Sequence, residues 1–266
     1  MYYFIKFFFF LISVQSFCQS ENLIDDFRKY KTTKSSFNLT KISGGLNYPW
    51  GLTFIDSENL IVTEKNGKIK KINITNGKVN VIQHNISNLK YRNDTSINGQ
   101  GGLLDVLYHD QYLYFSYSRS YEKINGKKVS STEIARGKLV NDRIENLEIL
   151  ISTEPKLEIN KHWGSRLVIK NNFLFAGFGD RGLGMIAQDP STHPGSIIRI
   201  NLDGTIPNDN PGLKKFTNWL PEIITIGVRN PQGIAISPHD GEIYFSQHGP
   251  RGGDNIGKIF FGAMAL

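Results

Sequence analysis

Cysteine is nearly absent from this 266-residue sequence, in which Cys18 is the only one. A chain with a single thiol has neither a disulfide framework nor a cysteine-based metal site. Long apolar runs are also missing, because the stretch from Phe7 to Val14 is too short to span a bilayer as a helix. We therefore expect no transmembrane segment and no metal held by cysteines.

The sequence also lacks a concentrated cluster of basic residues. The formal net charge is +7, but the lysines are scattered in small groups, such as Lys127 and Lys128 or Lys214 and Lys215. Nucleic-acid-binding domains gather basic side chains on one helix or face, often between aromatic ones. The sequence therefore argues against nucleic acid as a partner, although a modest basic excess favours an anionic small ligand.

The first residues predict a secretory signal peptide over residues 1–20. Lys6 supplies a positive start, and the apolar stretch from Phe7 to Val14 has the length of a signal-peptide core. Phe17 is bulky where a lipoprotein signal needs a small residue, so plain secretion is favoured over a lipid anchor at Cys18. Residues 21–41 are read as an N-terminal arm, with a short helical turn at 25–30, and residues 42–266 as one domain.

Glycine and aromatic residues are plentiful, and the apolar segments are short. The chain has 26 glycines and 12% aromatic residues, which suits an all-β protein with many turns. Helix-length apolar periods are missing, which argues against a parallel α/β sheet. From Leu52 to Ile82 four short strands are predicted, with an Asn-Gly hairpin signal at Asn66 and Gly67. This region is therefore expected to be a four-stranded antiparallel meander.

The same pattern of strands and turns then recurs along the chain. An apolar strand, a polar turn and a second apolar strand start near residues 51, 102, 166 and 233. Radial repetition of four-stranded meanders is typical of a β-propeller, which usually has about four to eight blades. The spacing leaves room for about four to five blades of antiparallel four-stranded sheets.

Polar motifs gather at one end of these predicted strands. His162 precedes one strand and Asp180 follows the next, so the two side chains are expected on one rim of the sheet. An imidazole and a carboxylate placed together can act as a general base and the group that orients it. The alternative is that His162 is a loop residue and Asp180 an ordinary turn residue.

Several motifs in one order resemble the glucose/sorbosone dehydrogenase family, the soluble quinoprotein aldose sugar dehydrogenases. They are GQGGLLD at 99–105, HWGSRL at 162–167, GDRG at 179–182, RNPQG at 229–233 and HGPRGGD at 248–254. The resemblance covers about Leu46 to Ala263. It implies a six-bladed β-propeller that lies in the periplasm and binds pyrroloquinoline quinone (PQQ) and calcium. Such a protein would oxidise the C1 hydroxyl of aldoses to give lactones and pass the electrons to an external acceptor.

The resemblance also implies roles for particular residues. His162 corresponds to the general base, Asp180 to the carboxylate that orients it, and Arg229 to a cation against the quinone oxygens. Gln100 and Asn230 correspond to residues that contact the cofactor. Calcium is expected on the backbone carbonyls of two further residues, Gly249 and Pro250. His109, His193, His239 and His248 are expected to be structural or loop residues.

Two departures from the family pattern stand out. Ser196 occupies a position where the family often has lysine, and little effect is expected. After Ala263 the family continues, whereas this sequence ends at Leu266; a real end, a frameshift or a fragment would each explain it. We expect a chain of this extent to form an incomplete propeller with weak PQQ binding and little activity.

Two other functions remain open from the sequence. One is a propeller lactonase that holds calcium with acidic and amide side chains, and the other is a non-catalytic propeller that binds a ligand or partner. The oxygen-rich stretch from Asn208 to Asn210 is a minor candidate for a second calcium site. The sequence does not specify the preferred sugar, the electron acceptor or the oligomeric state.

Overall fold

The structure, a computed structural model, describes residues 27–31, 33–91, 99–124 and 126–264. The predicted signal peptide, with Cys18, lies outside these ranges. Within them no helix is long and apolar enough to cross a membrane. The described chain is built from β-strands, with one helical turn, α1 (Pro211–Lys214), and one 3₁₀ helix, η2 (Gly184–Gln188).

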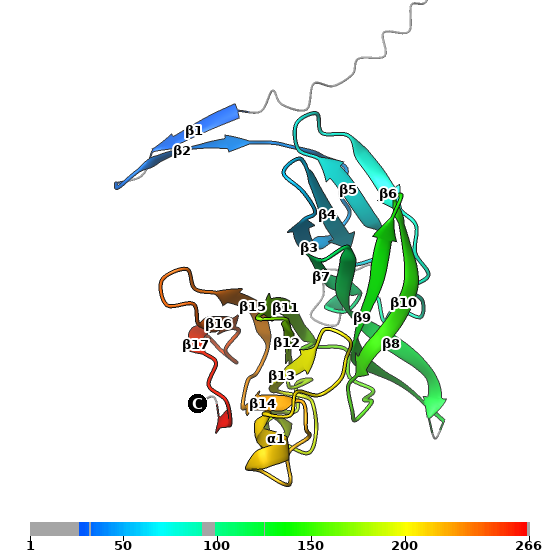
Figure 1. The fold of residues 1–266 in the computed structure, drawn as a ribbon, viewed down its shortest axis with the longest axis vertical. Helices are drawn as coiled ribbons and strands as arrows, with labels where there is room; N and C mark the ends of the chain where they lie inside the picture. The colour runs from blue at the N-terminus through cyan, green and yellow to red at the C-terminus, as the bar shows by residue number, and fades with distance from the viewer. Residues whose placement is uncertain (1–26, 32, 92–98, 125, 265–266) are drawn as a thin grey trace, which may run out of the picture.

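Four sheets follow one another around an arc, as the blades of a propeller do (Figure 1). The first blade has β3 (Pro49–Phe54), β4 (Asn59–Glu64), β5 (Ile69–Asn73) and β6 (Val79–Ile82), and the second has β7 (Leu103–His109), β8 (Tyr112–Ile124), β9 (Lys127–Val140) and β10 (Arg143–Ser152). The third has β11 (Gly164–Lys170), β12 (Phe173–Phe178), β13 (Ser196–Asn201) and β14 (Ile223–Ile226), and the fourth has β15 (Pro231–Ile236), β16 (Ile243–Gln247) and β17 (Asn255–Lys258). The predicted all-β propeller architecture is confirmed, with four blades in the described residues.

Two segments differ from the sequence prediction. The arm contains an antiparallel pair, β1 (Phe27–Lys31) and β2 (Ser36–Thr40), so the expected helical turn is wrong where it is described. Phe27 and Tyr30 in β1 and Phe37 and Thr40 in β2 belong to the residue types that favour strands. At the other end, β18 (Ala263–Met264) pairs in parallel with β14, so the third sheet gains a fifth strand.

Alternating side chains fill the spaces between blades. Leu113 and Phe115 of β8 pack against the first blade, whereas Tyr114 between them packs against the third. In the same way Ile198 and Ile200 of β13 face the second blade and Ile197 faces the fourth. Because successive side chains of a strand point to opposite faces, each sheet contributes to two cores.

Hydroxyl groups join the blades at equivalent positions of the repeat. Thr63 of β4 accepts the backbone N–H of Gly51 and donates to the carbonyl of Leu104 in the next blade. Ser116 of β8 accepts the N–H of Asp105 and donates to the carbonyl of Ser165. The first strands of the blades, β3, β7, β11 and β15, therefore lie side by side around the inside of the arc.

Candidate active site

His162 lies in the loop that enters β11, with its side chain buried. Its backbone has φ +54°, an uncommon conformation for a residue with a side chain. The Gln100 side chain accepts its N–H at 2.9 Å. The backbone carbonyl of His162 packs so closely on Gly179 that a Cβ at position 179 would lie 2.1 Å from the carbonyl oxygen. Backbone strain of this kind persists only where the surroundings enforce it, so the loop presents His162 in one orientation.

Asp180 follows β12 and meets the ring of His162. The distance from His162 Nδ1 to Asp180 Oδ1 is 2.6 Å, and both side chains are buried. The same carboxylate oxygen accepts the N–H of Gly182 at 2.7 Å. The N–H of Asp180 itself donates to the carbonyl of Arg229. The carboxylate is thus held from two sides, and its position fixes the imidazole plane.

Arg229 completes a line of three groups. Its Nη2 lies 3.2 Å from His162 Nε2, and its Nη1 donates to the carbonyl of His248 at 3.0 Å. The Gln247 side chain accepts its backbone N–H at 2.6 Å. A guanidinium can only donate, and a carboxylate can only accept. His162 therefore carries its proton on Nδ1, and its Nε2 lone pair faces Arg229.

Two amide side chains flank this line. Asn230 is buried, and its Oδ1 accepts the N–H of Gly164 at 3.2 Å. Gln100 uses its oxygen in the same way, on the N–H of His162. No described residue accepts a hydrogen bond from either amide nitrogen. Each side chain is therefore fixed by its oxygen and keeps two N–H donors for a ligand.

Gly249 and Pro250 lie in the loop between β16 and β17, just after His248. Asp254 holds this loop, because its carboxylate accepts the N–H of Gly249 at 2.8 Å and lies 3.3 Å from the ring of His248. The hydrogen bond from Gly249 lowers the pKa of Asp254 below its ordinary value. The carbonyl of His248 binds Arg229, so the loop adjoins the three-residue line.

Arg181 is a site residue that the sequence prediction missed. Its buried guanidinium donates to the carbonyls of Ser130, Lys161 and Ile159 and stacks 3.8 Å from the Trp163 ring centre. Burial lowers its pKa to about 9, so it stays charged at neutral pH. It joins β9 to the loop that carries His162. In the GDRG motif only Asp180 was recognised as a site residue. A turn motif does not indicate whether its arginine side chain is buried or exposed.

The structure brings five predicted residues together: His162, Asp180, Arg229, Gln100 and Asn230. Their roles stay predictions, as does calcium at Gly249 and Pro250. At Asn208–Asn210, Asp209 binds Arg199 and the amide nitrogen of Asn210 donates to two backbone carbonyls, and a second calcium there stays a prediction. No cluster of three or more histidine, cysteine or acidic side chains with metal-site geometry occurs in the described part of the chain.

The family model of glucose/sorbosone dehydrogenases matches residues 46–263. The chain belongs to this family. It is 30% identical to the aldose sugar dehydrogenase YliI of Escherichia coli K12 over 230 residues, which cover 84% of this chain and 59% of the relative. It is 29% identical to quinoprotein glucose dehydrogenase B of Acinetobacter calcoaceticus, over 95% of this chain and 56% of the relative.

A solved structure has the same fold. The apo form of the soluble aldose sugar dehydrogenase from Escherichia coli superposes with a TM-score of 0.72 at 30% identity, covering 82% of this chain and 62% of that one. The chain thus spans somewhat less than two thirds of the length of these glucose/sorbosone dehydrogenase relatives. The motifs that gather at the rim are therefore those of a sugar dehydrogenase family.

Proposed function

We propose that this chain carries the proton-abstracting part of a PQQ-dependent aldose dehydrogenase site, which oxidises a C1 hydroxyl to a lactone. The observation that carries the proposal is the His162 ring held between Asp180 and Arg229. Its neutral tautomer leaves a lone pair on Nε2, as a general base at neutral pH needs. The family membership and the quinoprotein relative support the same reading.

The donor set fits an anionic quinone. Arg229 supplies a half-buried cation, and the free amide N–H groups of Gln100 and Asn230 supply uncharged donors. When bound, PQQ would supply the acceptor for the hydride from C1. Calcium would lie on the carbonyls of Gly249 and Pro250, where oxygen ligands suit a hard cation. The loop that carries both residues adjoins Arg229 through His248.

The chain's own residues have three tasks in this proposal. His162 Nε2 takes the proton of the C1 hydroxyl, and Asp180 stabilises the imidazolium that forms. Arg229 now faces the lone pair of Nε2, so its guanidinium must turn toward the bound anion before a hydroxyl can approach. In that position it stabilises negative charge as it develops.

The other two candidate functions have less support. A lactonase of the kind considered above needs a convergent set of side-chain ligands for calcium, and the described residues contain no acidic or histidine cluster of that type. A non-catalytic propeller gives no reason for the line of Asp180, His162 and Arg229. An external electron acceptor and a periplasmic location remain part of the proposal.

A titration tests whether the site binds the cofactor. PQQ with calcium is added to the full chain, and tryptophan fluorescence and quinone absorbance are followed. Weak but saturable binding is expected, and Arg229→Gln should weaken it about tenfold or more because a charged hydrogen bond is lost. Arg143→Gln, on an exposed position of β10, is the matched control. Equal affinity in the Arg229 variant and the wild type would contradict the proposed site.

A further inference from the structure

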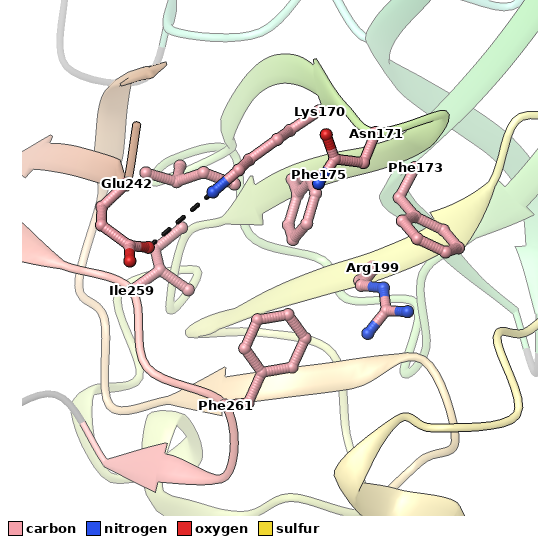
Figure 2. A pocket seen from close by; sticks show the side chains of 9 residues that line it. Lys170, Asn171, Phe173, Phe175, Arg199, Glu242, Ile259 and Phe261 are labelled. Carbon is pink, nitrogen blue, oxygen red and sulfur yellow. Dashed lines mark ion pairs between the residues drawn. The ribbon is translucent and has the colours of Figure 1, made fainter. Parts of the chain in front are cut away.

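A separate cavity of about 210 Å³ lies between the third and fourth blades (Figure 2). Its walls come from the β11–β12 turn, β12, β13, the start of β16 and the segment after β17. His162 and Asp180 lie at the opposite end of the β11–β12 hairpin. A seven-residue strand such as β11 spans about 20 Å, so this cavity is distinct from the rim site.

Aromatic and aliphatic side chains form most of the cavity. Phe175 and Phe261 meet edge to face, with ring centres 6.4 Å apart. Phe173, Ile243 and Ile259 complete the apolar lining. An apolar cavity of about 150 Å³ is enough to hold benzene. This cavity therefore has room for one aromatic ring and a small substituent.

The cavity also has a buried cation with unused donors. Arg199 of β13 is 4% exposed and stacks 4.0 Å from the Phe173 ring centre and 5.2 Å from that of Phe261. Among the described residues, Asp209 is the one hydrogen-bond partner of its guanidinium, through Nη2. The Nε atom is buried without an acceptor. A guanidinium has five N–H donors, and leaving them unpaired in a buried site is costly.

A second cation borders the same cavity. Lys170 lies 3.8 Å from Glu242, a long ion pair at the far side of the rings from Arg199 (Figure 2). Two cations and one carboxylate line the cavity, and Asp209 pairs with Arg199 from outside the lining. A ligand with an apolar ring and one negative charge matches both the rings and the Nε donor of Arg199 that Asp209 leaves unpaired.

We propose that this cavity binds a small aromatic carboxylate, with its ring among the phenyl groups and its carboxylate on Arg199. The ligand satisfies donors that the protein leaves unpaired, and its ring removes apolar surface from water. The site is independent of PQQ and sugar. A result that overturns benzoate binding here therefore says nothing against PQQ binding at the rim site, and the reverse also holds.

Benzoate is the probe, used with the full chain in the absence of PQQ and calcium. Saturation-transfer NMR and the shift in melting temperature give its affinity beside those of benzyl alcohol, which lacks the charge, and acetate, which lacks the ring. Benzoate is expected to bind more tightly than either. Arg199→Gln should weaken benzoate about tenfold or more while leaving benzyl alcohol nearly unchanged.

Matched variants locate the binding. Arg136→Gln is the control for arginine removal, because Arg136 also stacks on a ring, that of Tyr112, but lies in the second blade. Arg229→Gln excludes capture of benzoate at the rim. If Arg199→Gln does not fold, Phe261→Ala replaces it, since this half-exposed ring can be removed at lower cost. The proposal is overturned if benzoate does not saturate, or if it binds whichever of these variants folds as tightly as the wild type.

Discussion

His162 is held by one acceptor and one donor, and this pairing determines its chemistry. Asp180 accepts a hydrogen bond from Nδ1, and Arg229 faces Nε2. The ring cannot turn over without placing a donor against the guanidinium and an acceptor against the carboxylate. The tautomer that the proposed base requires is thus set before any substrate arrives, although Arg229 covers its Nε2.

The tautomer of His162 is open to direct measurement. Nitrogen-15 NMR of the full chain should show His162 protonated on Nδ1 at neutral pH. His193 is an internal control with the reverse expectation, because its Nδ1 accepts the N–H of Glu154 at 2.9 Å and its Nε2 lies 2.7 Å from Glu222. In Asp180→Asn the preference of His162 should weaken while that of His193 persists. An Nε2-protonated His162 in the wild type would refute the geometry.

The sequence predicted this site better than its surroundings. His162, Asp180, Arg229, Gln100 and Asn230 belong to contiguous motifs, and the structure gathers all five. Arg181 was missed because its role depends on carbonyls that are distant in sequence, such as that of Ser130. The contact between Arg229 and His162 Nε2 likewise depends on side-chain geometry that no motif encodes.

At the scale of strands, alternation of apolar residues was a good guide. The strands of the first blade were predicted within a few residues, and so were the starts of both strands in each later repeat. β8 continues to Ile124, well beyond its predicted end, and no strand was predicted at β14 or β17. β9 and β10 were missed, since β9 buries a polar run, Ser130–Glu133, that hides its period. Glu133 is satisfied there by the hydroxyls of Tyr117 and Tyr121 and by Arg119. Such partners are invisible in a hydropathy pattern.

The hydroxyl that joins the first two blades should contribute to stability. Thr63→Val keeps the shape of the side chain but removes the donor to Leu104 and the acceptor for Gly51. Leaving these buried groups unpaired should lower the free energy of unfolding by about 1–2 kcal/mol in urea titrations. Thr75→Val, at an exposed turn, should change it by less than about 0.5 kcal/mol. Equal effects would show that the link between blades is not stabilising.

A pH effect follows from the pair of His193 and Glu222, which ties the 189–195 loop to the start of β14. Burial alone would raise the pKa of Glu222, but hydrogen bonds from His193 and its own backbone lower it below the usual 4.5. The carboxylate therefore stabilises the folded state above about pH 4.5, and this contribution is lost as the pH falls through the lower folded-state pKa.

The test of this pair compares unfolding curves at several pH values between 6 and 3. The wild type should lose more stability over this range than Glu222→Gln does. Glu145→Gln, an exposed carboxylate on β10, should follow the wild-type profile. Parallel profiles for the wild type and Glu222→Gln would contradict the expected contribution.

At the scale of the whole molecule, one side chain links all four blades. Arg166 of β11 stacks on Trp50 of the first blade, pairs with Asp105 of the second at 2.8 Å and donates to the carbonyl of Gln232 in the fourth. Burial raises the pKa of Asp105, and the charge of Arg166 opposes the rise. The inside of the arc is therefore cross-linked by polar contacts as well as by the apolar cores.

Removing this link should affect the molecule as a unit. Asp105→Ala leaves Arg166 and the N–H of Leu167 without their acceptor, and should cost about 2–4 kcal/mol of unfolding free energy. The exposed pair of Lys127 and Glu158 is the control, since Glu158→Ala should cost less than about 1 kcal/mol. Similar losses for the two variants would mean that the inner contacts do not stabilise the arc.

The repeated strand pattern predicted the propeller. It did not predict how the last strand, β18, pairs with the rest. The parallel pairing of β18 with β14 depends on contacts that no periodicity reports. The cavity at Arg199 was unforeseen for a related reason, because it is formed where two blades meet. Periodicity identifies which residues form a blade, whereas the spaces between blades depend on how the blades pack.

The central claim is that His162 is the base of a quinone-dependent sugar oxidation. The most direct test is a single-turnover experiment, with the chain saturated with PQQ and calcium as judged by tryptophan fluorescence and then mixed with glucose or another aldose. The account predicts a sugar-dependent loss of quinone absorbance in the wild type that falls about 10²-fold or more in His162→Gln. Reduction at the same rate in both proteins, or no reduction in a PQQ-saturated wild type with any aldose, would contradict it.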